Sequence, residues 1–347
     1  MIDIKEYGYR GDIVPPDGLL IARVTAVHRE RYELVCANGT VFGKLKSSIY
    51  YHTGEEPFPT VGDFVFIRTV SGGDSLIVKT LPRTSYFARL DPDPNGGKQQ
   101  AVAANIDTVF IMTSLNHDFN VSRLERYLAL TRQSKSKPII IMTKADLVGD
   151  YETETAIAIA VAGETPVIPI SVIDGTGLEE VKEYLGPGQT VVFLGMSGVG
   201  KSSLLNALMG DEVMSVSSVR EKDSRGRHTT THRELFKLPG GAMVVDTPGM
   251  RTMGMWEADE GLSATFIDID LLAEKCRFGN CRHESEPGCA IQTALDSGEL
   301  TDEHWQNYLK LKKESSYTES KAEHRRIKSA RNKMIAMEIR RSKKSRQ

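Results

Sequence analysis

Residues Gly195 to Ser202 place the strongest constraint on what this chain can fold into. Their sequence, GMSGVGKS, fits the pattern G-x-x-x-x-G-K-[ST], in which a glycine-rich turn cradles phosphate groups. The apolar run Val191 to Leu194 precedes the turn, and the helix-forming run Ser203 to Leu208 follows it. Because a strand, this turn and a helix form the context that the pattern requires, the segment predicts a nucleotide-binding α/β domain.

The positions of this turn have different predicted roles towards a nucleotide. Lys201 supplies positive charge to the outer phosphates, and the Ser202 hydroxyl is a ligand to Mg²⁺. Backbone amides of the turn point towards phosphate oxygens at the N-terminus of the following helix. The predicted phosphate-binding residues are Gly195, Met196, Ser197, Gly198, Val199, Gly200, Lys201, Ser202 and Ser203.

Two segments downstream have the spacing of further phosphate-side motifs. Asp246 follows a β-rich run in the sequence DTPG, which suits an aspartate that reaches the metal through water, with the amide of Gly249 directed at the γ-phosphate. Between the two motifs lies RGRHTTT, residues 225–231, where a loop can contribute a threonine to Mg²⁺. Thr230 is the predicted second magnesium ligand, with Thr229 and Thr231 as alternatives.

A possible guanine-reading motif lies upstream of the phosphate turn. Thr143, Lys144 and Asp146 follow the apolar run Ile139 to Met142 in the sequence TKAD. The Asp146 carboxylate can accept from N1–H and the exocyclic amine of guanine, whereas adenine presents the opposite pattern. The stem of Lys144 can cover the base. The pocket is completed by predicted backbone contacts from Ser171 and Val172 to the guanine oxygen.

The order of these motifs is reversed relative to an ordinary GTPase, in which the guanine motif comes last. A nucleotide site needs its loops at the ends of neighbouring strands, wherever the chain is opened. The order therefore predicts a circularly permuted GTPase domain. Met250 follows Gly249 where many GTPases carry a water-orienting glutamine, so intrinsic hydrolysis should be slow. His228 is the candidate catalytic residue for aligning water, and contact with RNA or solvent is its alternative role.

A cysteine cluster near the C-terminus has metal-ligand spacing. Cys276, Cys281, His283 and Cys289 form the pattern C-x4-C-x-H-x5-C. Three thiolates and one imidazole complete a tetrahedral zinc site with no position left for water, so the predicted zinc is structural. Unrelated buried cysteines beside a surface histidine are the alternative.

The rest of the chain predicts a multidomain architecture. Five short β-rich runs favour an OB-fold barrel, with an SH3-like barrel as the alternative. These runs are Leu19 to Val27, Tyr32 to Cys36, Thr40 to Leu45, Phe64 to Val70 and Ser75 to Leu81. Residues 91–100 have the composition of a linker or loop. From Ile106 onwards strands alternate with helices, which indicates a largely parallel sheet covered on both faces. The predicted helices include Val121 to Gln133 and Leu178 to Leu185. A last helical run, Thr301 to Lys313, carries a stripe of Trp305, Tyr308 and Leu309, which favours core over an RNA platform. The predicted domains are an OB-fold RNA-binding barrel over 1–84, the permuted GTPase over 85–254, and a zinc domain with a basic helical tail over 255–347.

Charge is distributed unevenly along the 347 residues. The net charge is −2, but residues 321–347 carry eleven Lys and Arg against two Glu, so this tail is +9 and the remainder is −11. Such a tail suits binding to a polyanion, and a solvated disordered tail is the alternative. No apolar run approaches the ~20 residues that span a bilayer, and the N-terminus lacks a leader pattern, so we expect a cytoplasmic protein without membrane contact.

These motifs together resemble the RsgA (YjeQ) family of circularly permuted GTPases that assist assembly of the small ribosomal subunit. The matches lie at Gly195 to Ser203, residues 226–231, Asp246 to Gly249 and the cysteine cluster. The resemblance implies GTP/GDP, Mg²⁺ and one structural Zn²⁺, with the small ribosomal subunit and its rRNA as partners that stimulate hydrolysis; we expect a monomer. Thr143 departs from the usual asparagine, which predicts weaker guanine affinity with selectivity kept by Asp146.

Two functions of other classes compete with this interpretation. The chain could be an RNA-binding scaffold in which GTP is a regulatory ligand with incidental turnover. It could also be a P-loop ATPase that binds RNA. GTP turnover with and without small subunits tests the first, and competition between ATP and GTP tests the second.

Overall fold

The computed structural model describes residues 1–28, 31–53, 57–90, 99–116, 119–210, 233–246 and 258–317. These form two compact units: Met1–Phe87 with Ala101–Arg251, and Ala88–Gln100 with Thr252–Gln347. The first unit holds both the barrel and the nucleotide domain, and the predicted boundaries after residues 84 and 254 stay predictions. Within the described ranges no helix is long and apolar enough to cross a membrane.

The N-terminal barrel has the five strands that the sequence predicts. They are β1 (Leu20–Val27), β2 (Tyr32–Cys36), β3 (Gly39–Leu45), β4 (Phe64–Arg68) and β5 (Ser75–Thr80). Strand β1 pairs with both β2 and β4, and β3 pairs in parallel with β5, so the sheet closes on itself in OB-like order. The inward residues Val24, Leu34, Val65 and Ile77 are fully buried in one core. Their burial accounts for the apolar residues in the β-rich runs that predicted these strands.

The nucleotide domain is an α/β sheet in the strand order β10-β9-β8-β11-β13-β12. All neighbours are parallel except β12 and β13. The strands are β8 (Thr108–Ser114), β9 (Lys137–Thr143), β10 (Val167–Pro169), β11 (Thr190–Gly195), β12 (Arg233–Lys237) and β13 (Met243–Asp246). The alternation of strands and helices from Ile106 therefore forms the predicted largely parallel sheet.

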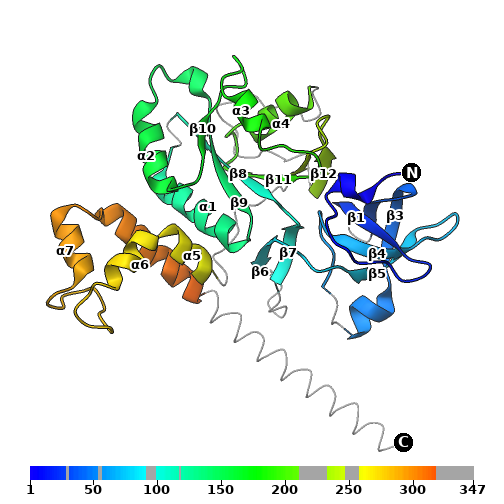
Figure 1. Ribbon diagram of the computed structural model, residues 1–347, viewed down its shortest axis with the longest axis horizontal. Helices are drawn as coiled ribbons and strands as arrows, with labels where there is room; N and C mark the ends of the chain where they lie inside the picture. The colour runs from blue at the N-terminus through cyan, green and yellow to red at the C-terminus, as the bar shows by residue number, and fades with distance from the viewer. Residues whose placement is uncertain are drawn as a thin grey trace, which may run out of the picture. The chain divides into compact units, whose positions relative to one another are not determined.

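Helices cover both faces of this sheet (Figure 1). They are α1 (Val121–Gln133), α2 (Glu152–Ala162), α3 (Leu178–Lys182) and α4 (Lys201–Met209). On one face Leu204, Leu205 and Val181 pack on a buried layer that includes Phe110 and Phe193, whose rings stack at 5.7 Å. This core fixes the start of α4 directly behind the end of β11, which is the geometry that a phosphate turn needs.

Two features of the strand pairing were not predicted. Strand β1 also pairs with β12, with Ala26 opposite Glu234, so barrel and nucleotide sheet form one continuous eleven-stranded sheet. Strands β6 (Tyr86–Leu90) and β7 (Gln99–Ala104) form a separate two-stranded sheet. The sequence indicated a linker over residues 91–100; residues 91–98 lie outside the described part of the chain, and Gln99 already belongs to a strand.

The second unit is helical around the cysteine cluster. Its helices are α5 (Asp259–Thr265), α6 (Ile267–Ala273), α7 (Ala290–Ser297) and a helix over residues 302–317. The aromatic stripe predicted on the last helix is core: Trp305 and Tyr308 are buried and stack with ring centroids 5.6 Å apart. Leu309, predicted in the same stripe, is 40% exposed instead, because the buried face follows Trp305, Tyr308 and Leu311.

Candidate nucleotide and metal sites

The predicted phosphate turn lies between the end of β11 and the start of α4. Gly198 and Gly200 have φ of 75° and 102°, in the left-handed region that favours glycine. A Cβ at Gly195 would meet the carbonyl oxygen of Met112 at 2.6 Å, so no other residue fits there without a shift of the backbone. The glycines of the pattern are therefore required by this backbone.

Lys201 brings its charge back over the turn. Its Nζ donates to the carbonyl oxygens of Gly195 at 2.8 Å and Met196 at 2.7 Å. The ammonium thus lies at the positive N-terminus of α4, beside the amides that would face a phosphate. The arrangement concentrates positive charge at one strand end, which suits a polyphosphate ligand.

The guanine motif lies at the same edge of the sheet. Thr143 ends β9, Lys144 has φ of 64°, and Asp146 is exposed in the short 3₁₀ helix η3 (Ala145–Leu147). In the strand order β9-β8-β11, only β8 separates this loop from the phosphate turn. Because all three strands are parallel, their carboxyl ends bring both motifs to one edge.

A hydrogen bond ties the two motifs together. The buried Thr143 Oγ1 donates to the carbonyl oxygen of Val199 at 2.7 Å, and it also lies 3.3 Å from that of Thr113. Val199 is part of the phosphate turn, so the first residue of the guanine motif holds that turn directly. The weaker guanine affinity predicted from Thr143 stays a prediction.

The loop after β10 adjoins the guanine motif. Ala145 N–H donates to the Ile170 carbonyl at 3.1 Å, which joins the two loops. Ser171 is buried; its Oγ accepts from the amide of Ile173 at 3.2 Å, and its own amide donates to Thr176 O at 3.0 Å. Ser171 thus organises its own loop in this structure, and base contacts from Ser171 and Val172 stay predictions.

The cysteine cluster has the dimensions of a zinc site. The ligand atoms of Cys276, Cys281, His283 and Cys289 all lie within 4.8 Å of one another. Cys276 Sγ is 4.0 Å from Cys289 Sγ, and each is 3.5 Å from His283 Nδ1. Tetrahedral zinc with Zn–S bonds of about 2.3 Å needs S–S separations near ~3.8 Å and S–N separations near ~3.5 Å. The four side chains therefore fit zinc.

Surrounding groups orient these ligands. The Ala290 amide donates to Cys276 Sγ at 3.4 Å, and Trp305 meets the His283 ring edge-on with centroids 5.9 Å apart. His283 itself has φ of 60°, a left-handed conformation that turns its ring towards the cysteines. Such outer contacts fix ligand geometry in metal sites.

Comparisons with known proteins show the family of this chain. The family model described as RsgA GTPase matches residues 80–256. The chain belongs to the RsgA GTPase family. A relative from Listeria monocytogenes, named small ribosomal subunit biogenesis GTPase RsgA 1, is 45% identical over 295 residues, which cover 85% of this chain and 83% of that protein. An RsgA of Methanosarcina acetivorans is 38% identical over 331 residues, which cover 94% and 89%.

Solved structures show the same fold. YjeQ from Thermotoga maritima superposes with a TM-score of 0.62 at 25% identity, over 84% of this chain and 97% of that one. YloQ, described as a circularly permuted GTPase, gives a TM-score of 0.58 at 24% identity, over 85% and 94%. The predicted fold class, a barrel before a permuted GTPase domain, is thus confirmed, as is the resemblance to the RsgA family.

Of the predicted site residues downstream of the phosphate turn, only part lies within the described ranges. Asp246 ends β13, adjacent to β11, so its backbone reaches the edge that carries the phosphate turn. The predicted functional residues outside the described ranges are His228, Thr230 with its alternatives Thr229 and Thr231, Gly249, Met250 and the basic tail 321–347. Their roles stay predictions.

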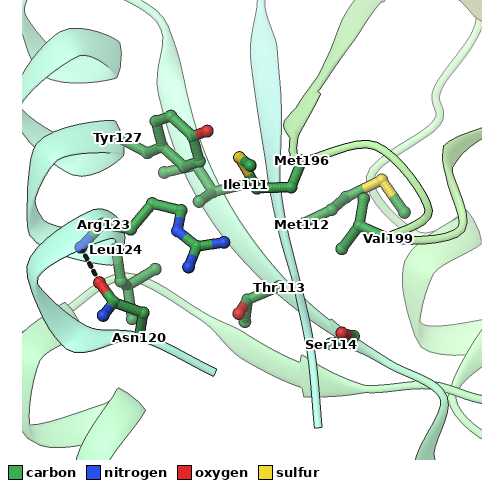
Figure 2. Close-up of a pocket in the computed structure, with 10 residues that line it drawn as sticks. All are labelled: Ile111, Met112, Thr113, Ser114, Asn120, Arg123, Leu124, Tyr127, Met196 and Val199. Carbon is green, nitrogen blue, oxygen red and sulfur yellow. Dashed lines mark hydrogen bonds between the residues drawn. The ribbon is translucent and has the colours of Figure 1, made fainter. Parts of the chain in front are cut away.

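Sequence reasoning did not find a pocket beside the phosphate turn (Figure 2). It lies between β8, α1 and the turn, and Arg123 extends across it towards Met196. Asn120 caps α1 by accepting from the Arg123 amide at 2.8 Å. An asparagine before a helical run is a recognisable cap, but nothing in the sequence joins this helix start to the phosphate turn. The pocket is lined by Ile111, Met112, Thr113, Ser114, Asn120, Arg123, Leu124, Tyr127, Met196 and Val199.

The bond from Thr143 gives a first prediction. Thr143→Val keeps the shape of the side chain but removes the donor, leaving the buried Val199 carbonyl without this partner. We expect the dissociation constants of GDP and GTP to rise about tenfold, since losing one buried hydrogen bond costs about 1–2 kcal/mol. Isothermal titration measures this. Thr143→Ser retains the hydroxyl and is the control; equal affinities for the Val and Ser variants would contradict the role.

Proposed function

We propose that this RsgA family GTPase binds the small ribosomal subunit through rRNA, assists its late maturation, and hydrolyses GTP to GDP and phosphate to trigger its own release. The Thr143–Val199 bond carries the nucleotide half of the proposal, because it unites the guanine motif and the phosphate turn in one site. The names of the relatives, small ribosomal subunit biogenesis GTPases, support the ribosomal half.

In the proposed site, recognition of base and phosphates is divided between the two motifs. Asp146 accepts from the guanine N1–H and amine while the stem of Lys144 covers the base. Lys201 moves from its two carbonyl acceptors to the outer phosphates, and Ser202 with Thr230 holds Mg²⁺. Asp246 lies near the metal, and the Gly249 amide faces the γ-phosphate. Structural zinc is held by the four residues of the cysteine cluster.

Hydrolysis transfers the γ-phosphoryl group to water and breaks its bond to the β–γ bridging oxygen. Lys201 and the amides of the turn stabilise the charge that develops on the leaving GDP. Met250 has no group that can orient water. The site is therefore incomplete alone, and we propose that the subunit completes it, with His228 as the residue of this chain that aligns water.

The barrel supplies a surface suited to nucleic acid. The Arg31 guanidinium lies 3.8 Å from the centroid of the Phe42 ring, and Phe42 and Lys44 are exposed on β3. Both cations pair with Asp74 in this structure, Arg31 at 2.7 Å and Lys44 at 3.1 Å. We propose that RNA phosphates replace this carboxylate while the ring stacks on an unpaired base. Together with the basic composition of residues 321–347, this surface supports rRNA as a partner. We also propose a cytoplasmic location and action as a monomer.

The deciding experiment is GTP turnover with and without purified small subunits. We expect stimulation of about tenfold or more, because the missing water-orienting group is worth at least that much in GTPases. Lys201→Ala is the control that should abolish turnover under both conditions. Subunit binding without stimulation would favour the scaffold alternative, and equal competition by ATP and GTP would favour the ATPase.

A further inference from the structure

A buried arginine joins the barrel to the nucleotide domain. Arg23 lies within β1 and is only 1% exposed. One terminal nitrogen donates to the Tyr7 carbonyl and lies 3.3 Å from Met243 Sδ. The other donates to Thr190 Oγ1 at 2.8 Å and to the Asn105 carbonyl at 3.3 Å. A single guanidinium thus contacts four separate segments of the chain.

Two of these contacts lie at the base of the strands that carry nucleotide motifs. Thr190 begins β11, which ends at the phosphate turn, and Met243 begins β13, which ends at Asp246. Thr190 and Met243 are also direct partners in the sheet. Arg23, from the barrel, therefore contacts the paired amino ends of both strands.

A second layer of polar contacts surrounds this joint. Asp107 accepts from the Thr190 amide at 2.8 Å and from Arg10 at 2.6 Å. Beneath the guanidinium lies the ring of Phe64, with its centroid 4.9 Å from Arg23 Cζ. The Phe64 ring thus contacts the guanidinium from the barrel side, while Asp107 holds Thr190, its partner on the nucleotide side. Movement of the barrel relative to β11 would have to break or shift them.

Stability alone does not account for an arginine here. Burial lowers the pKa of Arg23 to about 10, because the charged guanidinium loses contact with water. At neutral pH the side chain is charged, so its burial costs free energy of folding. Its Nε has no hydrogen-bond partner within the described part of the chain. Well-packed apolar residues often serve at least as well for stability at such positions. What arginine adds is a rigid planar fork that fixes several partners in direction.

We propose that Arg23 is a positioning residue that couples engagement of the barrel to the nucleotide site. Displacement of β1 by bound RNA shifts the guanidinium, and with it the amino ends of β11 and β13 that carry the phosphate turn and Asp246. The inference rests on the proposed function for its biological ligand. Because coupling between two binding sites is reciprocal, nucleotide binding must also change the affinity of the barrel for RNA. We expect that change to be detectable in the barrel strands.

Reciprocity allows a test on the full chain without the ribosome. Hydrogen exchange is measured with and without a non-hydrolysable GTP analogue, in the natural protein and in Arg23→Met. We expect the analogue to slow exchange in both the phosphate turn and the barrel strands of the natural protein. In Arg23→Met the turn should remain protected while the nucleotide-dependent change in the barrel falls about fivefold or more, the lower range of coupling energies.

Arg132→Met is the matched control, because Arg132 is a part-buried arginine that donates to Ala162 O and Thr165 Oγ1 inside the nucleotide domain. It should keep the change in the barrel. Thermal melting shows whether each variant folds. Arg23→Lys retains the positive charge but lacks the planar guanidinium, so it should transmit only part of the nucleotide-dependent change to the barrel. Equal changes in the barrel of natural protein and Arg23→Met, or no change in either, would overturn the inference.

The subunit assay separates this inference from the proposed function. With small subunits, Arg23→Met should retain basal turnover and subunit binding but lose about fivefold or more of the stimulated kcat. Full stimulation of the variant would overturn the role of Arg23 and leave the proposed function standing. Natural protein that is not stimulated would contradict the proposed function, while the exchange experiment still decides the role of Arg23.

Discussion

Asp146→Asn is expected to exchange guanine recognition for xanthine recognition. A carboxylate accepts from two donors of guanine, N1–H and the exocyclic amine. Xanthine carries an oxygen acceptor in place of that amine, so it needs one acceptor and one donor from the protein. The asparagine amide supplies that pair. Asp146 is exposed at the strand edge beside the phosphate turn, where a base can reach it.

The expected size of this change is large. The bond to N1–H loses its charge assistance, and the bond to the exocyclic amine is replaced by a donor facing a donor, so the dissociation constant of GDP should rise about 100-fold or more. That of XDP should fall by a similar factor. Competition titrations with GDP, XDP and ADP measure both. Because phosphate contacts are untouched, XTP turnover by the variant should approach GTP turnover by the natural protein.

Asp150→Asn is the matched control for this exchange. Asp150 is also exposed and accepts from the Glu152 amide at 2.9 Å, at the start of α2 rather than in the guanine motif. It should leave GDP and XDP affinities as they are. Unchanged GDP binding by Asp146→Asn would remove Asp146 from the base site and with it the guanine specificity that we propose.

Loss of zinc is expected to unfold the region around the cysteine cluster. Binding of structural zinc supplies about 10–16 kcal/mol in small zinc domains, and that free energy is folding free energy. Cys289 is buried and immediately precedes α7, so a metal held there fixes the start of that helix. Cys289→Ser, or chelation of the natural protein, should remove both metal and helix.

Zinc content by atomic emission and limited proteolysis together check this prediction. The natural protein should hold one zinc per chain, and Cys289→Ser should hold less than about a tenth of that and be cut rapidly around the cluster. Nucleotide affinity should change little, because the nucleotide motifs belong to the first compact unit and the cysteine cluster to the second. Cys36→Ser is the control, because Cys36 is a buried cysteine of the barrel core. Retention of zinc by Cys289→Ser would exclude it as a ligand.

Local patterns were enough to place most elements of the nucleotide domain. The helix predicted over Val121 to Gln133 matches α1 residue for residue, because an asparagine cap and helical periodicity both mark its start. The helix predicted over Leu178 to Leu185 ends three residues earlier, at Lys182, close before Gly186 and Pro187. Barrel strands were also predicted to within two residues at their ends.

Features that depend on tertiary contacts could not be predicted from sequence. An arginine in an alternating strand is typical of a solvated position, yet Arg23 is buried where two domains meet. The hairpin of β6 and β7 was missed because proline and glycine over residues 92–97 indicate a linker. Thr143 was predicted as part of the guanine motif and as a departure from asparagine, but its bond to Val199 depends on tertiary structure and could not be predicted.

The short connection from α3 to β11 has a consequence for how the two halves of the nucleotide site stay assembled. Only residues 183–189 separate Lys182 from Thr190, and they join the guanine-reading half to the phosphate-binding half. An ordinary GTPase has its free ends at this place. Here the link keeps the halves at a high effective concentration. A protease nick within it would turn their association into an encounter between two fragments, governed by dilution.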